Sequence, residues 1–180
     1  MNDKDKKFLL TLARKAIKAH LDEEDFNPGN VLPEFCKKGC CFVTLSLDGE
    51  LRGCIGNLEA FEPLYKNIIS NAVNAAFNDN RFNSLSYAEF HRVKIEISVL
   101  FPPEKLFYLN SDDLLSNLSS DMGVILKKGY HQSTFLPQVW EVIPDKVEFL
   151  ENLCLKAGLA PIAWMDNAEI YIYKVTKFSE

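Results

Sequence analysis

Residues 41–56, with the sequence CFVTLSLDGELRGCIG, decide the fold of the first half of this chain. Cys41–Leu47 alternates apolar and polar side chains as a strand does, and Glu50–Ile55 runs back after the pair Asp48-Gly49. An Asp-Gly pair tolerates the positive φ angles that a two-residue type I′ turn requires. The sequence therefore predicts a tight β-hairpin at this place.

The register of this hairpin predicts the directions of its side chains. A two-residue turn puts Leu45 opposite Arg52 and Val43 opposite Cys54. Side chains two residues apart on a strand share a face, so we expect Arg52 and Cys54 to point the same way. A guanidinium group beside a thiol stabilises the thiolate and lowers the thiol pKa, whereas burial alone raises it. Cys54 is therefore a candidate nucleophile or acid/base group.

The same motif has a second, purely structural interpretation. Gly53 and Gly56 can expose backbone N–H groups to an oxyanion or phosphate, which makes them candidate substrate-binding residues. Glycines within strands, however, also mark bulges or close packing. A free cysteine such as Cys54 often behaves as a small buried hydrophobe. Residue chemistry leaves both interpretations open.

Two further side chains are candidates for moving protons. Glu96 lies within the predicted strand Val93–Phe101, on the face opposite its apolar residues. It is a candidate partner of Arg52 or Arg81, a candidate catalytic base, or a solvated surface group. His131 lies near the tip of a predicted hairpin and is either a general base for the thiol or an idle surface residue.

Three polar side chains complete the candidate site. Arg81, in a turn-like polar segment, could clamp a carboxylate or phosphate with two hydrogen bonds, or could brace the preceding helix. Thr134 and Gln138 offer neutral hydrogen bonds within an otherwise apolar segment, which we expect to form a packed wall between two lobes.

Composition and net charge limit the classes of protein to which this chain could belong. The chain has 180 residues, of which 47% are hydrophobic and 25% charged, as in an ordinary globular protein with one core or two lobes. Its net charge of −5 gives no support to nonspecific nucleic-acid binding, which requires basic surface. We expect neither a membrane span nor a signal peptide, and hence a cytoplasmic protein.

The five cysteines fit a reducing compartment. Cys36 and the pair Cys40-Cys41 suggest a zinc site, but no second cluster supplies the remaining ligands that structural zinc requires. Cys154 falls on the apolar stripe of a predicted helix. We therefore expect no metal and no cofactor.

Spacing of apolar residues, caps and turn residues predicts the other elements. Helices are predicted at Asp3–Leu21, Phe61–Phe77, after the capping box Ser86–Glu89, at Asp112–Leu118 behind a Ser111 cap, and at Pro144–Ala157. Strands are predicted at Val93–Phe101, Met122–Leu126, Gln132–Leu136 and Glu169–Val175. This order favours an α+β fold (α/β in the broad sense) with a mainly antiparallel or mixed sheet flanked by helices.

Four blocks of sequence carry a family resemblance. They are LRGCIG at 51–56, DNRF at 79–82, IEISVL at 95–100 and TFLPQVWE at 134–141. In these blocks and their order the chain resembles the AMMECR-one domain family, whose prokaryotic members are called AmmeMemoRadiSam system protein A. Two positions depart from the family pattern: Asn80 stands where proline is usual, and Ser133 where alanine is common.

The resemblance implies a fold more clearly than an activity. It implies that residues 1–180 form a single AMMECR-one domain with a larger and a smaller subdomain, and that the cysteine motif lies near a cleft between them. The family's activity is unsettled, although action on RNA has been proposed. Its name implies association with a Memo-like protein and a radical S-adenosylmethionine protein.

We therefore expect a small cytosolic enzyme or enzyme-like protein that acts on a small metabolite or nucleotide-like substrate. The candidate catalytic residues are Cys54, Glu96 and His131, and the candidate substrate-binding residues are Arg52, Gly53, Gly56, Arg81, Thr134 and Gln138. The alternatives are a non-catalytic protein-binding module and, third, RNA binding or modification.

Overall fold

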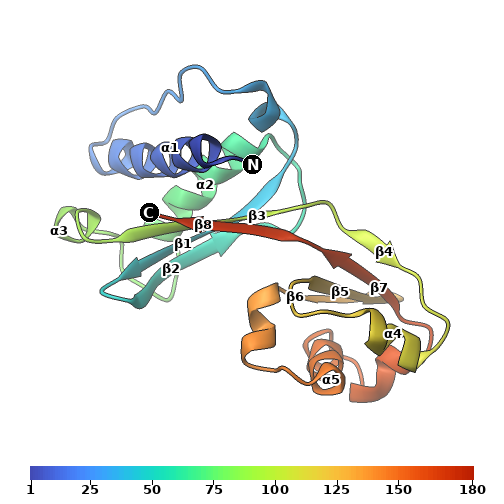
Figure 1. The fold of residues 1–180 in the computed structure, drawn as a ribbon. Coiled ribbons are helices and arrows are strands. Elements are labelled where there is room, and N and C mark those ends of the chain that lie inside the picture. The colour runs from blue at the N-terminus through green and yellow to red at the C-terminus, as the bar shows by residue number, and fades with distance from the viewer. The chain divides into compact units, whose positions relative to one another are not determined.

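The computed structural model describes all residues from Met1 to Glu180, which divide into two compact units. Unit 1 comprises Met1–Leu100 and Thr176–Glu180, and unit 2 comprises Phe101–Val175. Each unit is built around one antiparallel four-stranded sheet with its own helices (Figure 1). The predicted α+β class is confirmed. No helix combines the length and the apolar character needed to cross a membrane.

Unit 1 has the strand order β2-β1-β3-β8, so β2 lies at an edge of its sheet. Its elements are α1 (Asp3–Leu21), the 3₁₀ helix η1 (Pro33–Cys36), β1 (Cys40–Leu47), β2 (Glu50–Gly56), α2 (Leu64–Phe77), α3 (Tyr87–Phe90), β3 (Lys94–Leu100) and β8 (Val175–Ser179).

Helices α1 and α2 both pack on one face of this sheet (Figure 1). The strand residues that meet them are fully buried: Val43, Leu45, Ile95 and Ile97. Because strand side chains alternate, the residues between them point to the opposite face, which carries no helix of unit 1. We call this opposite side of the sheet the helix-free face.

Local signals explain where the helices begin. The predicted bounds of α1 are confirmed, because Asn2 and Asp5 form a reciprocal capping box at its start. The predicted start of α2 at Phe61 is wrong. Pro63 is its N-cap residue in an extended conformation, and the helix begins at Leu64. The capping box of Ser86 and Glu89 is confirmed in α3.

Unit 2 has the strand order β4-β7-β5-β6. Its elements are β4 (Glu104–Leu106), α4 (Ser111–Asn117), β5 (Gly123–Lys128), β6 (His131–Phe135), η2 (Pro137–Glu141), α5 (Lys146–Lys156), η3 (Pro161–Met165) and β7 (Glu169–Tyr173). Its core is built around Phe149, whose ring stacks on Trp140 with 3.5 Å between the centroids.

Unit 2 differs from the sequence-based expectation at three places. The predicted strand Glu169–Val175 ends at Tyr173, and β8 is a separate strand in the other sheet. Strand β4 was not predicted. The cap of α4 is Asn110, whose side chain accepts the Asp113 backbone N–H, and not Ser111.

Candidate functional site

The hairpin contains a β-bulge that changes the register of the motif. Next to the turn, Ser46 pairs with Leu51 as predicted. The register then shifts by one residue, so that Leu45 pairs with Gly53. Arg52 is the extra residue on the bulged strand. The predicted pairing of Leu45 with Arg52 is therefore wrong.

The shift places Cys54 on the helix-free face. Its partner on β1 is Thr44 and not Val43 as predicted. The Thr44 hydroxyl donates to Cys54 Sγ over 3.3 Å, and the thiol is half-buried. Because Val43 faces the core, its neighbour Thr44 and the paired Cys54 face the other way. The expectation that Arg52 lies beside Cys54 on one face is thus wrong.

Arg52 forms its ion pair with Glu89, which was predicted only as part of a helix capping box. Its Nε lies 2.8 Å from Glu89 Oε1, and its Nη2 lies 3.2 Å from Glu89 Oε2 and 2.8 Å from the Asn83 carbonyl oxygen. Arg52 is only 8% exposed. These hydrogen bonds, together with those from Ser86, lower the pKa of Glu89 to about 2.

Glu96 is not the partner of either arginine. It lies across from Thr44 on β3, and its Oε1 is 3.0 Å from Lys177 Nζ on β8. Since Thr44 also pairs with Cys54, three polar residues lie opposite one another across β2, β1 and β3, and Lys177 reaches Glu96 from β8. We call Cys54, Thr44, Glu96 and Lys177 the polar row. Cys54 and Glu96 are two strand spacings apart, about 9.6 Å at their backbones.

The backbone of Cys54 is held by two side chains at the sheet edge. Its N–H donates to Asp79 Oδ2 over 2.9 Å, and its carbonyl accepts from Arg81 Nη2 at 3.4 Å. Arg81 also donates twice to Asp79, from Nε to Oδ1 at 3.0 Å and from Nη2 to Oδ2 at 2.7 Å. Asp79 and Arg81 thus bond the backbone N–H and carbonyl of Cys54, which have no neighbouring strand on this side because β2 is an edge strand.

The Asp79–Arg81 pair also places two ionised groups beside Cys54. Asp79 is buried, and the Arg81 hydrogen bonds, helped by the Cys54 N–H, hold the pKa of that carboxyl well below its usual range. Arg81 is half exposed, and its Nη2 lies 3.4 Å from the Cys54 carbonyl oxygen. The guanidinium group near the thiol is therefore that of Arg81, and the carboxylate it clamps belongs to the chain itself.

The two glycines of the motif permit close packing. A Cβ atom at Gly53 would lie 2.1 Å from the carbonyl oxygen of Ala75 in α2. A Cβ atom at Gly56 would lie 2.3 Å from the ring of Phe42. Any side chain at either position would force the backbone or the ring to move, which accounts for both glycines without a ligand. Substrate binding by Gly53 and Gly56 stays a prediction.

The other predicted site residues belong to unit 2, where His131 and Thr134 have local partners. His131 is exposed, and its Nδ1 lies 2.8 Å from the Ala157 carbonyl oxygen. Thr134 is buried, donates to the Val124 carbonyl over 2.9 Å, and lies 3.1 Å from the Tyr173 hydroxyl. Gln138 is exposed on η2.

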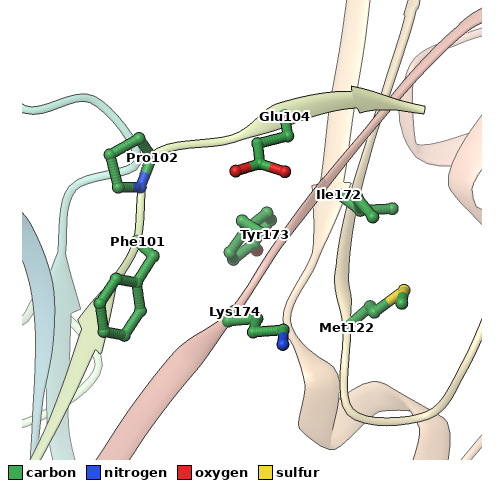
Figure 2. Close-up of a pocket in the computed structure, with 7 residues that line it drawn as sticks. All are labelled: Phe101, Pro102, Glu104, Met122, Ile172, Tyr173 and Lys174. Carbon is green, nitrogen blue, oxygen red and sulfur yellow. The ribbon is translucent and has the colours of Figure 1, made fainter. Parts of the chain in front are cut away.

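Unit 2 also contains a cavity of about 310 Å³ that the sequence did not indicate. Figure 2 shows the Glu104 carboxylate directed towards Tyr173, with Phe101 and Pro102 on one side and Met122 and Ile172 on the other. The ring of Tyr173 lies where a Cβ of residue 123 would be, so Gly123 makes room for it. Thr134 contacts one lining residue of this cavity, because its hydroxyl lies 3.1 Å from that of Tyr173.

Sequence reasoning missed the residues that hold the motif in place: Thr44, Asp79, Phe82 and Glu89. Asp79 and Arg81, two residues apart directly after a helix, were the one available signal, because a carboxylate and a guanidinium at that spacing can pair. Glu89 was recognised only as a cap, and no local pattern shows that the same carboxylate also binds Arg52.

Comparison with known proteins is consistent across the chain. The AMMECR1 family model matches residues 10–178. The chain is 39% identical to protein MK0488 of Methanopyrus kandleri, with 96% of this chain and 87% of that protein covered. It is 36% identical to protein Mbar_A1807 of Methanosarcina barkeri, with 100% and 92% covered.

A solved structure agrees with the fold. The crystal structure of the uncharacterised protein PH0010 from Pyrococcus horikoshii matches with a TM-score of 0.86 at 33% identity, and covers 100% of this chain and 93% of that one. A family match over almost the whole length, together with relatives above 30% identity, establishes the assignment. The chain belongs to the AMMECR1 family.

Proposed function

We propose that this protein is a small enzyme or enzyme-like protein in which Cys54 performs nucleophilic or acid/base chemistry on a small metabolite or nucleotide-like substrate. The reaction would take place on the helix-free face, along the polar row. Because all five cysteines are unpaired, we place this chemistry in the cytoplasm, where thiols stay reduced.

One observation carries the proposal: Cys54 is held firmly and yet stays accessible. Asp79 and Arg81 bind its backbone on one side, and Thr44 donates to its sulfur on the other. Three of the other cysteines, Cys40, Cys41 and Cys154, are buried instead. Burial raises the pKa of each of these three thiols, that of Cys41 to about 12, so they are poor nucleophiles.

The polar row offers the groups that thiol chemistry needs. The Thr44 hydroxyl already donates to Sγ and so orients the sulfur. Glu96 lies one strand further along the same face and could accept a proton through a substrate group or water between them. Lys177 would hold Glu96 in position through its ion pair.

The test compares two thiols in the same molecule. Iodoacetamide labelling, read peptide by peptide in a mass spectrometer across pH, should modify Cys54 faster than the exposed Cys36 at pH 7. Arg81→Gln should slow labelling of Cys54 and leave Cys36 unchanged. Thr44→Val removes the donor without changing any charge and should slow Cys54 by a smaller factor. Labelling of Cys54 no faster than that of Cys36 would refute the proposal.

A specific observation also favours a protein-binding module as the second candidate. Two large apolar side chains follow the edge strand β4 and are almost completely exposed, Phe107 at 81% and Leu109 at 92%. By family analogy the partners would be Memo-like and radical S-adenosylmethionine proteins. This function predicts that Phe107→Ser with Leu109→Ser abolishes biological activity and that Cys54→Ser preserves it, the reverse of the enzyme hypothesis.

A further inference from the structure

We propose that the groove beside the strand edge, on the Arg52 side of the bulge, is a binding site for an oxyanion, the phosphate or carboxylate group of a small ligand. The groove has a volume of about 400 Å³. Six residues line it: Arg52, Asn80, Arg81, Phe82, Asn83 and Glu89. The site does not require Cys54 to react, so it goes beyond the proposed function.

The first observation is an unused donor on a buried guanidinium group. Arg52 is 92% buried, and its Nε and Nη2 are occupied by Glu89 and the Asn83 carbonyl. Its Nη1 is buried and has no hydrogen-bond partner. A buried donor without an acceptor costs free energy, and an acceptor brought by a ligand would recover it. Arg52 lines the groove, so that ligand would bind there.

The second observation is that the nearby carboxylates bind other donors and not Arg52 Nη1. Asp79 already accepts from the Cys54 N–H and from the backbone and side chain of Arg81. Glu89 accepts from Arg52 and from the N–H and hydroxyl groups of Ser86. Neither carboxylate bonds to Arg52 Nη1, so this donor is open to an acceptor that a ligand brings.

The third observation explains why the ligand group is an anion. The ring of Phe82 lies close to two guanidinium groups, with its centroid 5.8 Å from Arg52 Cζ and 5.4 Å from Arg81 Cζ. Arg52 is also shielded from water, and charge interactions are stronger where water is excluded. Hydrogen bonds between a guanidinium group and an oxyanion are about twice as strong as neutral ones. Two cations and the amides of Asn80 and Asn83 thus give the groove many donors.

Inorganic phosphate and acetate are the probes for the test. Each is titrated separately into ¹⁵N-labelled protein at constant ionic strength, and the amide signals of residues 80–83 and the Nε signal of Arg52 are followed. We expect a saturable shift of these signals with at least one of the two anions. A response to phosphate alone or acetate alone identifies which oxyanion the groove prefers.

Replacing Arg52 itself could unfold unit 1, because it would leave Glu89 unpaired. The informative variant is Asn80→Asp, which adds one negative charge to an exposed residue of the groove and should weaken binding by about tenfold. Asn30→Asp makes the same change at an exposed site outside the groove and should leave binding unchanged. No saturable shift with either anion, or equal weakening by both variants, would overturn the proposal.

Discussion

The ion pair of Arg52 and Glu89 should stabilise unit 1, and a double-mutant cycle measures by how much. The pKa of Glu89 falls from its ordinary 4.5 to about 2, a difference worth about 3.4 kcal/mol between the folded and unfolded states. Ser86 supplies part of this effect, and the Glu89 side chain is 27% exposed, so solvent screens another part. We therefore expect a coupling energy of about 2 kcal/mol between Arg52 and Glu89.

The cycle uses Arg52→Met, Glu89→Gln and the double variant. Arg52→Met should cost the most, about 3 kcal/mol, because it leaves a partly buried carboxylate without its partner. The double variant should cost less than the two single losses together. Glu89→Gln removes the carboxylate charge but keeps an amide oxygen that can still accept a hydrogen bond from Arg52, so it should be the milder change.

Native-state hydrogen exchange is the suitable assay, because it follows each unit separately. The slowest amides of β1 and α2 report the unfolding of unit 1. Trp140 and Trp164 both lie in unit 2, and their fluorescence under denaturant tests whether unit 2 is unaffected. A coupling energy below about 0.5 kcal/mol would refute the view that Arg52 is fixed by Glu89.

Three further predictions follow from other contacts. Gly53→Ala should lower the free energy of unfolding by about 2–4 kcal/mol in denaturant titrations, because its Cβ would overlap the Ala75 carbonyl oxygen; an unchanged midpoint would contradict the bulge geometry. Acid should destabilise unit 1, because Asp79 and Glu89 have lowered pKa values in the folded state. Their contribution to stability is complete above about pH 4.5 and is lost as the pH falls towards 2. The double variant Asp79→Asn with Glu89→Gln should flatten this pH dependence, measured by hydrogen exchange at several pH values. Thr134→Val should lower the free energy of unfolding of unit 2 by about 1–2 kcal/mol, because the Val124 carbonyl and the Tyr173 hydroxyl each lose a partner. Denaturant titrations followed by tryptophan fluorescence measure this loss. A neutral effect would show that Tyr173 is held by its hydrogen bond to the Phe135 carbonyl.

The sequence predicts those elements whose causes are local. The hairpin turn follows from Asp48 and Gly49, which both have positive φ in the structure. The start of α1 and the cap of α3 follow from reciprocal side-chain and backbone bonds within four residues. In each case all the interacting groups lie in one short window, so pattern and structure agree.

The candidate site could be predicted only in part, because tertiary contacts build it. The bulge at Arg52 brings Gly53 against α2 and lets the guanidinium group reach Glu89, which lies 37 residues along the chain. A strand pattern of period two cannot indicate such an insertion, and a shift of one residue reverses the face of every later side chain. That single shift accounts for the error about Arg52 and Cys54.

The bulge also changes how variants of the LRGCIG motif should be interpreted. Arg52 reaches towards the groove at the strand edge, whereas Cys54 faces the polar row on the helix-free face. Loss of function in an Arg52 variant would therefore report the stability of unit 1 or anion binding, and would say nothing direct about the thiol. Asp79 and Arg81 bind the backbone of Cys54, and Thr44 donates a hydrogen bond to its sulfur. A reactivity change in Thr44→Val, which removes no charge and alters no residue that lines the groove, would thus separate cysteine chemistry from anion binding.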